Sequence, residues 1–96
     1  MNGIIAAVLL PVLLCAQKPA VEQAWELLAQ DKRPAAVALL RSAVRARPVD
    51  ADARLLLGSL LAEAGESAEA IAHLREGVRL RPMDAMAQNA LGEALR

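Results

Sequence analysis

The stretch GVRLRPMDAMA at Gly77–Ala87 repeats, with few changes, an earlier stretch of the same chain, AVRARPVDADA at Ala43–Ala53. Pro48 and Pro82 lie 34 positions apart (82 − 48), and an aspartate follows each of them at the same offset. Sequence periods of about 20–50 residues are typical of proteins that stack copies of one supersecondary unit. The repeated phrase therefore predicts that equivalent units of this chain meet at the same kind of joint.

The segments between the joints carry the apolar spacing of α-helices. Residues 51–64 and 69–80 place apolar side chains three and four positions apart, which is the helical period. Asp50 and Asp84 are suited to cap the helices that follow them, because a carboxylate accepts hydrogen bonds from first-turn N–H groups. Ser67 is a possible cap for the helix between them. No strand pattern of alternating apolar and polar residues is sustained, so an all-α chain is predicted.

The unit at Ala51–Asp84 resembles the tetratricopeptide repeat, a helix–turn–helix unit of about 34 residues. The resemblance is carried by Leu57, Gly58, Leu61, Gly65, Ala70, Leu74, Gly77 and Pro82. The third unit repeats Leu91-Gly92 and Leu95, whereas the first unit has Gln23-Ala24 in place of Leu-Gly. The resemblance implies a right-handed α-solenoid of antiparallel helix pairs, with repeats 17–50 and 51–84 and a partial or capping helix at 85–96.

Small and large side chains recur in the same order in these units. We expect Gly58, Ala70 and Gly77 to let paired helices approach closely. The large residues expected to fill the space beside them are Leu57, Leu61 and Leu74. Because Gly92 is the 34-residue counterpart of Gly58, we expect these two glycines to lie in similar surroundings. The tryptophan that the family carries early in its first helix is replaced by Arg54 and Gln88.

The N-terminal residues differ from the rest of the chain. Ile4–Leu14 is an uncharged apolar run of eleven residues, within the ~7–15 of a signal peptide and short of the ~20 of a spanning helix. We therefore expect a signal peptide at 1–16 and the repeat domain at 17–96. A buried helix is the alternative, which Pro11 disfavours. The sequence VLLC ending at Cys15 resembles the lipobox of bacterial lipoproteins, so lipid anchoring is a second possibility.

In tetratricopeptide repeat domains the first helices line a concave groove that holds an extended peptide or a helix of a partner. The resemblance implies that the groove residues here are Val21, Trp25, Leu28, Asp52, Leu55, Ser59, Ala62, Met86, Asn89 and Glu93. Val21 and Trp25 stand where chaperone-binding members carry Lys and Asn, so we predict no clamp for a C-terminal carboxylate. Trp25 is interpreted either as the main partner contact or as a core or capping residue of the terminal repeat.

The charges point away from several function classes. Eleven basic and eleven acidic residues balance, so we expect no nucleic-acid partner and no membrane contact apart from the leader. The recurring arginines are Arg41, Arg45, Arg47, Arg75, Arg79 and Arg81. We interpret them as offsets to helix macrodipoles rather than a basic ridge for phosphates. His73 is expected to be solvated. The single histidine and single cysteine predict no catalytic residue, metal ion or cofactor.

The sequence therefore leads to a hypothesis of a non-enzymatic protein-interaction module, exported to the periplasm or secreted. The alternative is a recruiting or regulatory segment of a larger exported or membrane-anchored enzyme. Self-association through exposed repeat ends is a third hypothesis.

Overall fold

The computed structural model describes residues 18–96, which form helices joined by short turns and contain no β-strand. The helices are α2 (Ala20–Ala29), α3 (Arg33–Ala46), α4 (Ala51–Glu63), α5 (Ser67–Leu80) and α6 (Ala85–Leu95). The predicted all-α class is confirmed for this part of the chain. The signal peptide predicted at 1–16, including Cys15, lies outside the described residues.

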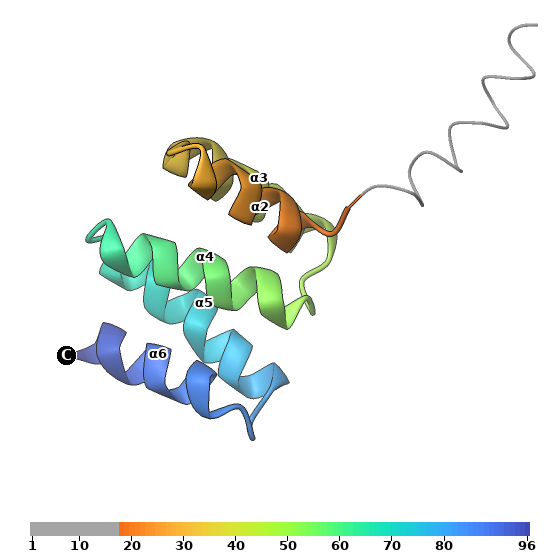
Figure 1. Ribbon diagram of the computed structural model, residues 1–96. Helices are drawn as coiled ribbons and strands as arrows, with labels where there is room; N and C mark the ends of the chain where they lie inside the picture. The colour runs from red at the N-terminus through yellow and green to blue at the C-terminus, as the bar shows by residue number, and fades with distance from the viewer. Residues whose placement is uncertain (1–17) are drawn as a thin grey trace, which may run out of the picture.

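The helices stack in chain order as two antiparallel pairs followed by a single helix (Figure 1). α2 packs on α3 and α4 packs on α5, while α6 lies against α5 and, over a smaller area, against α4. α2 also contacts α4, so the first helices of successive units are neighbours. Residues 18–96 therefore form the α-solenoid of antiparallel helix pairs that the resemblance implies.

The repeated phrase forms the same joint twice. The backbone N–H of Asp50 donates to Arg47 O at 3.0 Å, and that of Asp84 donates to Arg81 O at 3.1 Å. The Asp50 carboxylate then accepts a hydrogen bond from Ala53 N at 3.1 Å, and Asp84 caps α6 in the same way. The predicted caps are confirmed, and they satisfy N–H groups that the helix itself leaves without partners.

Two different side chains close these joints at the position of the missing tryptophan. Arg54 Nε donates to the carbonyl oxygen of Pro48 at 2.7 Å. Gln88 Nε2 donates to the carbonyl oxygen of Pro82 at 2.6 Å. The position therefore keeps a role in fixing the turn although neither residue is aromatic.

The turn inside each helix pair also recurs. Asp31 and Gly65 both adopt left-handed backbone angles, with φ of 60° and 85°. The N–H of the next residue donates to the carbonyl oxygen of Leu27 in the first turn and of Leu61 in the second, which is the Schellman arrangement. The prediction that Ser67 caps α5 is wrong: Ser67 is the first residue of the helix, and the residue before it makes no side-chain capping hydrogen bond.

Small-to-large packing holds the second pair together. A Cβ atom at Gly58 would lie 2.6 Å from Leu74 Cγ, and one at Gly77 would collide with Leu55. The largest fully buried side chains are Leu40, Leu57 and Leu74. The expected similarity of Gly58 and Gly92 is wrong, because no atom lies within 4 Å of a Cβ built at Gly92. The cover of Gly58 comes from α5, and residues 18–96 contain no counterpart of α5 beyond α6.

Candidate functional site

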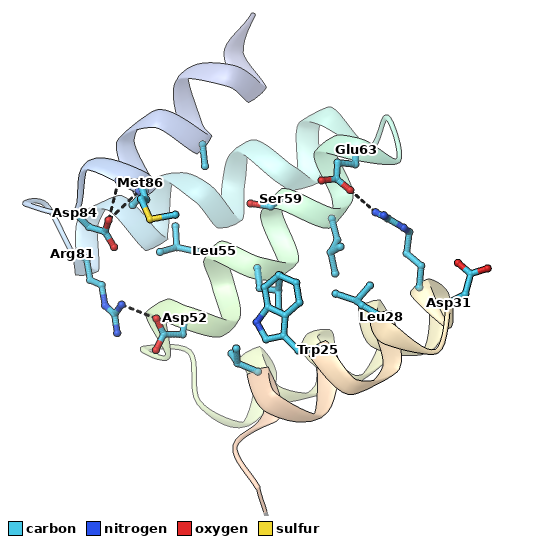
Figure 2. A pocket seen from close by; sticks show the side chains of 16 residues that line it. Trp25, Leu28, Asp31, Asp52, Leu55, Ser59, Glu63, Arg81, Asp84 and Met86 are labelled. Carbon is cyan, nitrogen blue, oxygen red and sulfur yellow. Dashed lines mark hydrogen bonds and ion pairs between the residues drawn. The ribbon is translucent and has the colours of Figure 1, made fainter.

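A groove with a volume of about 690 Å³ crosses the first helices of the three units, α2, α4 and α6 (Figure 2). Seven of the ten groove residues expected from the sequence line it. They are Val21, Trp25, Leu28, Asp52, Leu55, Ser59 and Met86. The repeat therefore brings together residues that lie up to 65 positions apart in the chain (86 − 21).

The floor of the groove is apolar because each helix turns one face toward it. α2 contributes Val21, Trp25 and Leu28, which are four and three positions apart and so lie on one side of the helix. α4 adds Leu55 beside them. The Trp25 side chain projects into the groove (Figure 2) and is 57% exposed. The alternative interpretation of Trp25 as a core residue is therefore wrong.

Three expected groove residues do not line the groove. Ala62 is partly buried and packs against the hydrophobic core instead. Asn89 and Glu93 are exposed on α6. They are the 34-residue counterparts of Leu55 and Ser59, which lie in the groove because α6 flanks α4. No helix of residues 18–96 flanks α6 on the corresponding side.

The two edges of the groove are polar, and of their residues only Asp52 was expected from the sequence. One edge, the turn rim, consists of Asp31, Arg33 and Glu63, and the opposite edge, the cap rim, consists of Asp52, Arg81 and Asp84.

An ion pair spans two elements on each rim, as the dashed lines in Figure 2 show. Arg33 Nη1 lies 2.6 Å from Glu63 Oε2, and Arg81 Nη1 lies 2.6 Å from Asp52 Oδ1. The sequence does indicate that the rim residues lie at or next to the ends of helices. Side chains at helix ends border the face that parallel helices form.

A second polar cluster joins the two repeats away from the groove. Arg54 Nη1 lies 3.3 Å from His73 Nδ1, and Glu69 Oε2 lies 3.9 Å from His73 Nε2. Glu69 also pairs with Arg41 at 3.0 Å. The His73 side chain is only 17% exposed, so the prediction of a solvated histidine is wrong. Its burial, followed by the positive charge of Arg54, lowers the pKa of His73 below its ordinary value.

Carboxylates offset several of the recurring arginines. Arg79 pairs with Glu76 one turn before it on α5, and this hydrogen-bonded contact lowers the pKa of Glu76. Arg41 and Arg81 have carboxylate partners on other helices. Three of the six recurring arginines thus lie in ion pairs, which favours the structural interpretation over a basic ridge.

Within residues 18–96, no group of three or more His, Cys, Asp or Glu side chains is placed to hold a metal ion. None of the helices α2–α6 combines the length and hydropathy needed to cross a bilayer.

Comparison with known proteins agrees with the repeat pattern. The family model for the tetratricopeptide repeat matches residues 21–85 and, in a second match, residues 63–96. No curated protein sequence matches the chain. The two matches together span all but the first helical residue of the described helices. The chain belongs to the tetratricopeptide repeat family.

Proposed function

We propose that this chain is a non-catalytic, exported protein-interaction module that binds a peptide or a helix of a partner in the groove across α2, α4 and α6. Tetratricopeptide repeats generally mediate protein–protein interaction and are typically non-catalytic. The proposal adds the groove as the place of binding and the leader as the means of export.

The observation that carries the proposal is the exposure of large apolar side chains in the groove. Trp25 is 57% exposed and Met86 is 83% exposed, and both line the same hollow as Leu55. Contiguous exposed apolar surface with a polar border is typical of interaction sites. Tryptophan is also enriched among residues that contribute most to binding. A partner that covers these side chains removes apolar area from water and gains affinity by doing so.

The shape of the site favours an amphipathic helix as the bound segment. An apolar floor lies between two polar rims, so a ligand with one apolar face and polar flanks meets matching surfaces on all sides. Helices bind hydrophobic grooves through apolar side chains spaced three and four positions apart. An extended peptide instead points alternate side chains away from the floor.

Export is inferred from the leader. The apolar run at 4–14 is uncharged and has the length of a signal-peptide core. Expression in a bacterial host followed by fractionation and N-terminal sequencing tests this part. We expect a chain that begins near residue 17 outside the cytoplasm. A chain that retains Met1 in the soluble cytoplasmic fraction contradicts export.

The groove is tested by photo-crosslinking in cell extract. A photoreactive amino acid at Ser59, which lines the groove, is expected to capture partner protein. The same residue at Ser42, which is exposed on α3, serves as the matched control and is expected to capture none of it.

Substitutions in the Ser59-labelled chain make the test specific. Trp25→Ala is expected to abolish the crosslink. Met83→Ala, which removes an apolar side chain that is 94% exposed and lies outside the groove, is expected to preserve it. Equal capture by both substituted chains contradicts the proposed binding site.

A further inference from the structure

Residues 18–96 contain two methionines, Met83 and Met86, and both lie at the surface of the molecule. Met83 is 94% exposed and Met86 is 83% exposed. The buried apolar side chains of this part of the chain are all alanine, leucine or valine. An oxidant that attacks methionine therefore reaches both sulfur atoms without opening the core.

The two methionines differ in their relation to the groove. Met86 lines the groove, whereas Met83 does not. Figure 2 shows the Met86 side chain, with its sulfur atom, among the side chains that surround the hollow. The other α6 residues that line the groove are Ala87 and Ala90. Met86 is therefore the only large apolar side chain that α6 contributes, and a change in its polarity alters this whole side of the groove.

The backbone of Met86 is held independently of its side chain. The Met86 N–H donates to Asp84 Oδ1 at 3.0 Å, and the Ala87 N–H donates to the same oxygen at 3.3 Å. Changes to exposed side chains usually alter the free energy of unfolding very little. A chemical change at the Met86 sulfur is therefore expected to leave α6 and the shape of the groove in place.

We propose that Met86 is a modification site, at which oxidation of the thioether to the sulfoxide by a peroxide weakens the binding of the partner. This inference rests on the proposed function of the groove and adds its regulation. With hydrogen peroxide, a lone pair of the Met86 sulfur attacks one peroxide oxygen and the O–O bond breaks. The sulfur loses two electrons and gains that oxygen, while the other oxygen leaves as water. Methionine sulfoxide reductases return the sulfoxide to the thioether.

The expected loss of affinity follows from the burial of Met86 in the complex. In the free chain the sulfoxide oxygen is hydrated, because the side chain is exposed. A partner that covers the groove removes this water, and burying a polar group without a hydrogen-bond partner costs free energy. Oxidation also reduces the apolar area whose burial favours binding. Both effects act only in the complex, so the affinity falls while the fold is retained.

The probe is a designed amphipathic peptide of about 15 residues, long enough for about four helical turns. It carries leucines three and four positions apart and has no methionine, cysteine or aromatic residue. Trp25 is the only aromatic residue of the chain, so its fluorescence reports binding in the groove without a label. The whole 96-residue chain is titrated before and after treatment with hydrogen peroxide, which is removed before the peptide is added. Mass spectrometry verifies that Met86 has gained one oxygen atom and that Trp25 has gained none.

The untreated chain is expected to bind the peptide and to change its Trp25 fluorescence. An untreated chain that shows no change contradicts both the proposed groove function and the inference. After oxidation the peptide is expected to bind about five- to thirtyfold more weakly, and reduction by the sulfoxide reductases is expected to restore the affinity. Unchanged affinity after oxidation, or a loss that persists after reduction, overturns the inference alone and leaves the groove as a binding surface.

Two variants assign the effect to one sulfur atom. Met83→Leu removes the exposed methionine outside the groove, and this chain is expected to lose affinity on oxidation as the wild-type chain does. The Met86→Leu chain is compared with itself before and after treatment, and peroxide is expected to have no effect on its affinity. Met1, Cys15 and Met83 remain in that chain. An equal loss in the Met86→Leu chain assigns the effect to one of these residues and overturns the inference.

Discussion

α4 and α6 are first helices of successive units and share a sequence pattern, yet they are covered very differently. Leu61 of α4 is 2% exposed, whereas its counterpart Leu95 of α6 is 53% exposed. Gly58 lies against Leu74, and Gly92 faces open space. Both helices nonetheless share the features that depend on nearby sequence. Each begins with an aspartate cap, and each has a side chain that donates a hydrogen bond to the carbonyl oxygen of the preceding proline. Local sequence therefore sets where each helix begins, and the next helix in the stack sets how deeply it is buried.

The largest expected difference between the two helices is in the leucine near each C-terminal end. Leu61→Ala leaves a cavity in the core and is expected to lower the free energy of unfolding by about 2–5 kcal/mol. Leu95→Ala removes a mostly exposed side chain and is expected to change the free energy of unfolding by no more than about 0.5 kcal/mol. Urea denaturation followed by circular dichroism measures both. Equal losses would mean that Leu95 is covered in solution.

Replacing Gly58 and replacing Gly92 with alanine are expected to change the free energy of unfolding in opposite directions. Gly58→Ala forces a Cβ atom toward Leu74 and is expected to cost about 1–3 kcal/mol, as overpacking does. Gly92→Ala adds a methyl group in open space and is expected to stabilise α6 by about 0.5–1 kcal/mol, because alanine favours the helix over glycine.

The same denaturation experiment decides this second comparison. Destabilisation by Gly92→Ala would show that a neighbouring helix approaches α6 as α5 approaches α4.

Removing either aspartate cap is expected to lower the free energy of unfolding by a similar amount, because both caps depend on local sequence. Asp50→Ala and Asp84→Ala each leave first-turn N–H groups without a side-chain acceptor. Each is expected to cost about 0.5–2 kcal/mol. Asp→Asn at either position is the control and is expected to retain most of the stability, since asparagine also caps helices. A cost at one position only would show that the two joints are not equivalent.

The smallest expected effect is a dependence of stability on pH that arises where α4 contacts His73 of α5. Arg54 of α4 contacts His73, and Gln88 has no such contact among the described residues. The groups that face His73 are Arg54, Glu69 and Arg41. The pKa of His73 is lowered in the folded chain, so the unfolded chain binds the proton first as the pH falls. Stability is therefore complete above the ordinary histidine pKa of 6.5 and decreases as the pH falls below it.

The check is chemical denaturation at several pH values with His73→Gln as the reference. Glutamine can still accept from Arg54 but does not titrate in this range. The wild-type chain is expected to lose more stability than the variant below pH 6.5. Parallel curves for the two chains would show that His73 protonation does not oppose folding.

Most of the fold was predictable because its determinants are local or periodic. The repeat interval, the prolines and the aspartate caps lie within one short phrase, and the structure confirms the caps and the helix pairs that this phrase predicted. The small-to-large packing of Gly58 against Leu74 also followed from the repeat. Seven of the ten groove residues could be named because the resemblance to the tetratricopeptide repeat implies which positions of the first helices face the groove.

What could not be predicted depends on neighbours distant in sequence. The repeat interval gave no indication that no helix among residues 18–96 covers Gly92 and Asn89 as their counterparts in α4 are covered. The burial of His73 requires knowing that Arg54 reaches it from another helix. The rim ion pairs join residues 30 positions apart, Arg33 and Glu63, and 29 positions apart, Arg81 and Asp52 (81 − 52). Neither separation corresponds to a helical or repeat period. These features follow from three-dimensional packing alone.

The central claim is that partners bind the face formed by the first helices of the stacked units. Nuclear magnetic resonance of the isotope-labelled chain, titrated with a designed amphipathic helical peptide that carries leucines three and four positions apart, tests it most directly. The claim predicts that the single indole N–H signal of Trp25 and the amide signals of Leu55 and Ser59 shift together with one affinity. Shifts confined to the outer surface of α3 and α5, with the Trp25 signal unchanged, would contradict it.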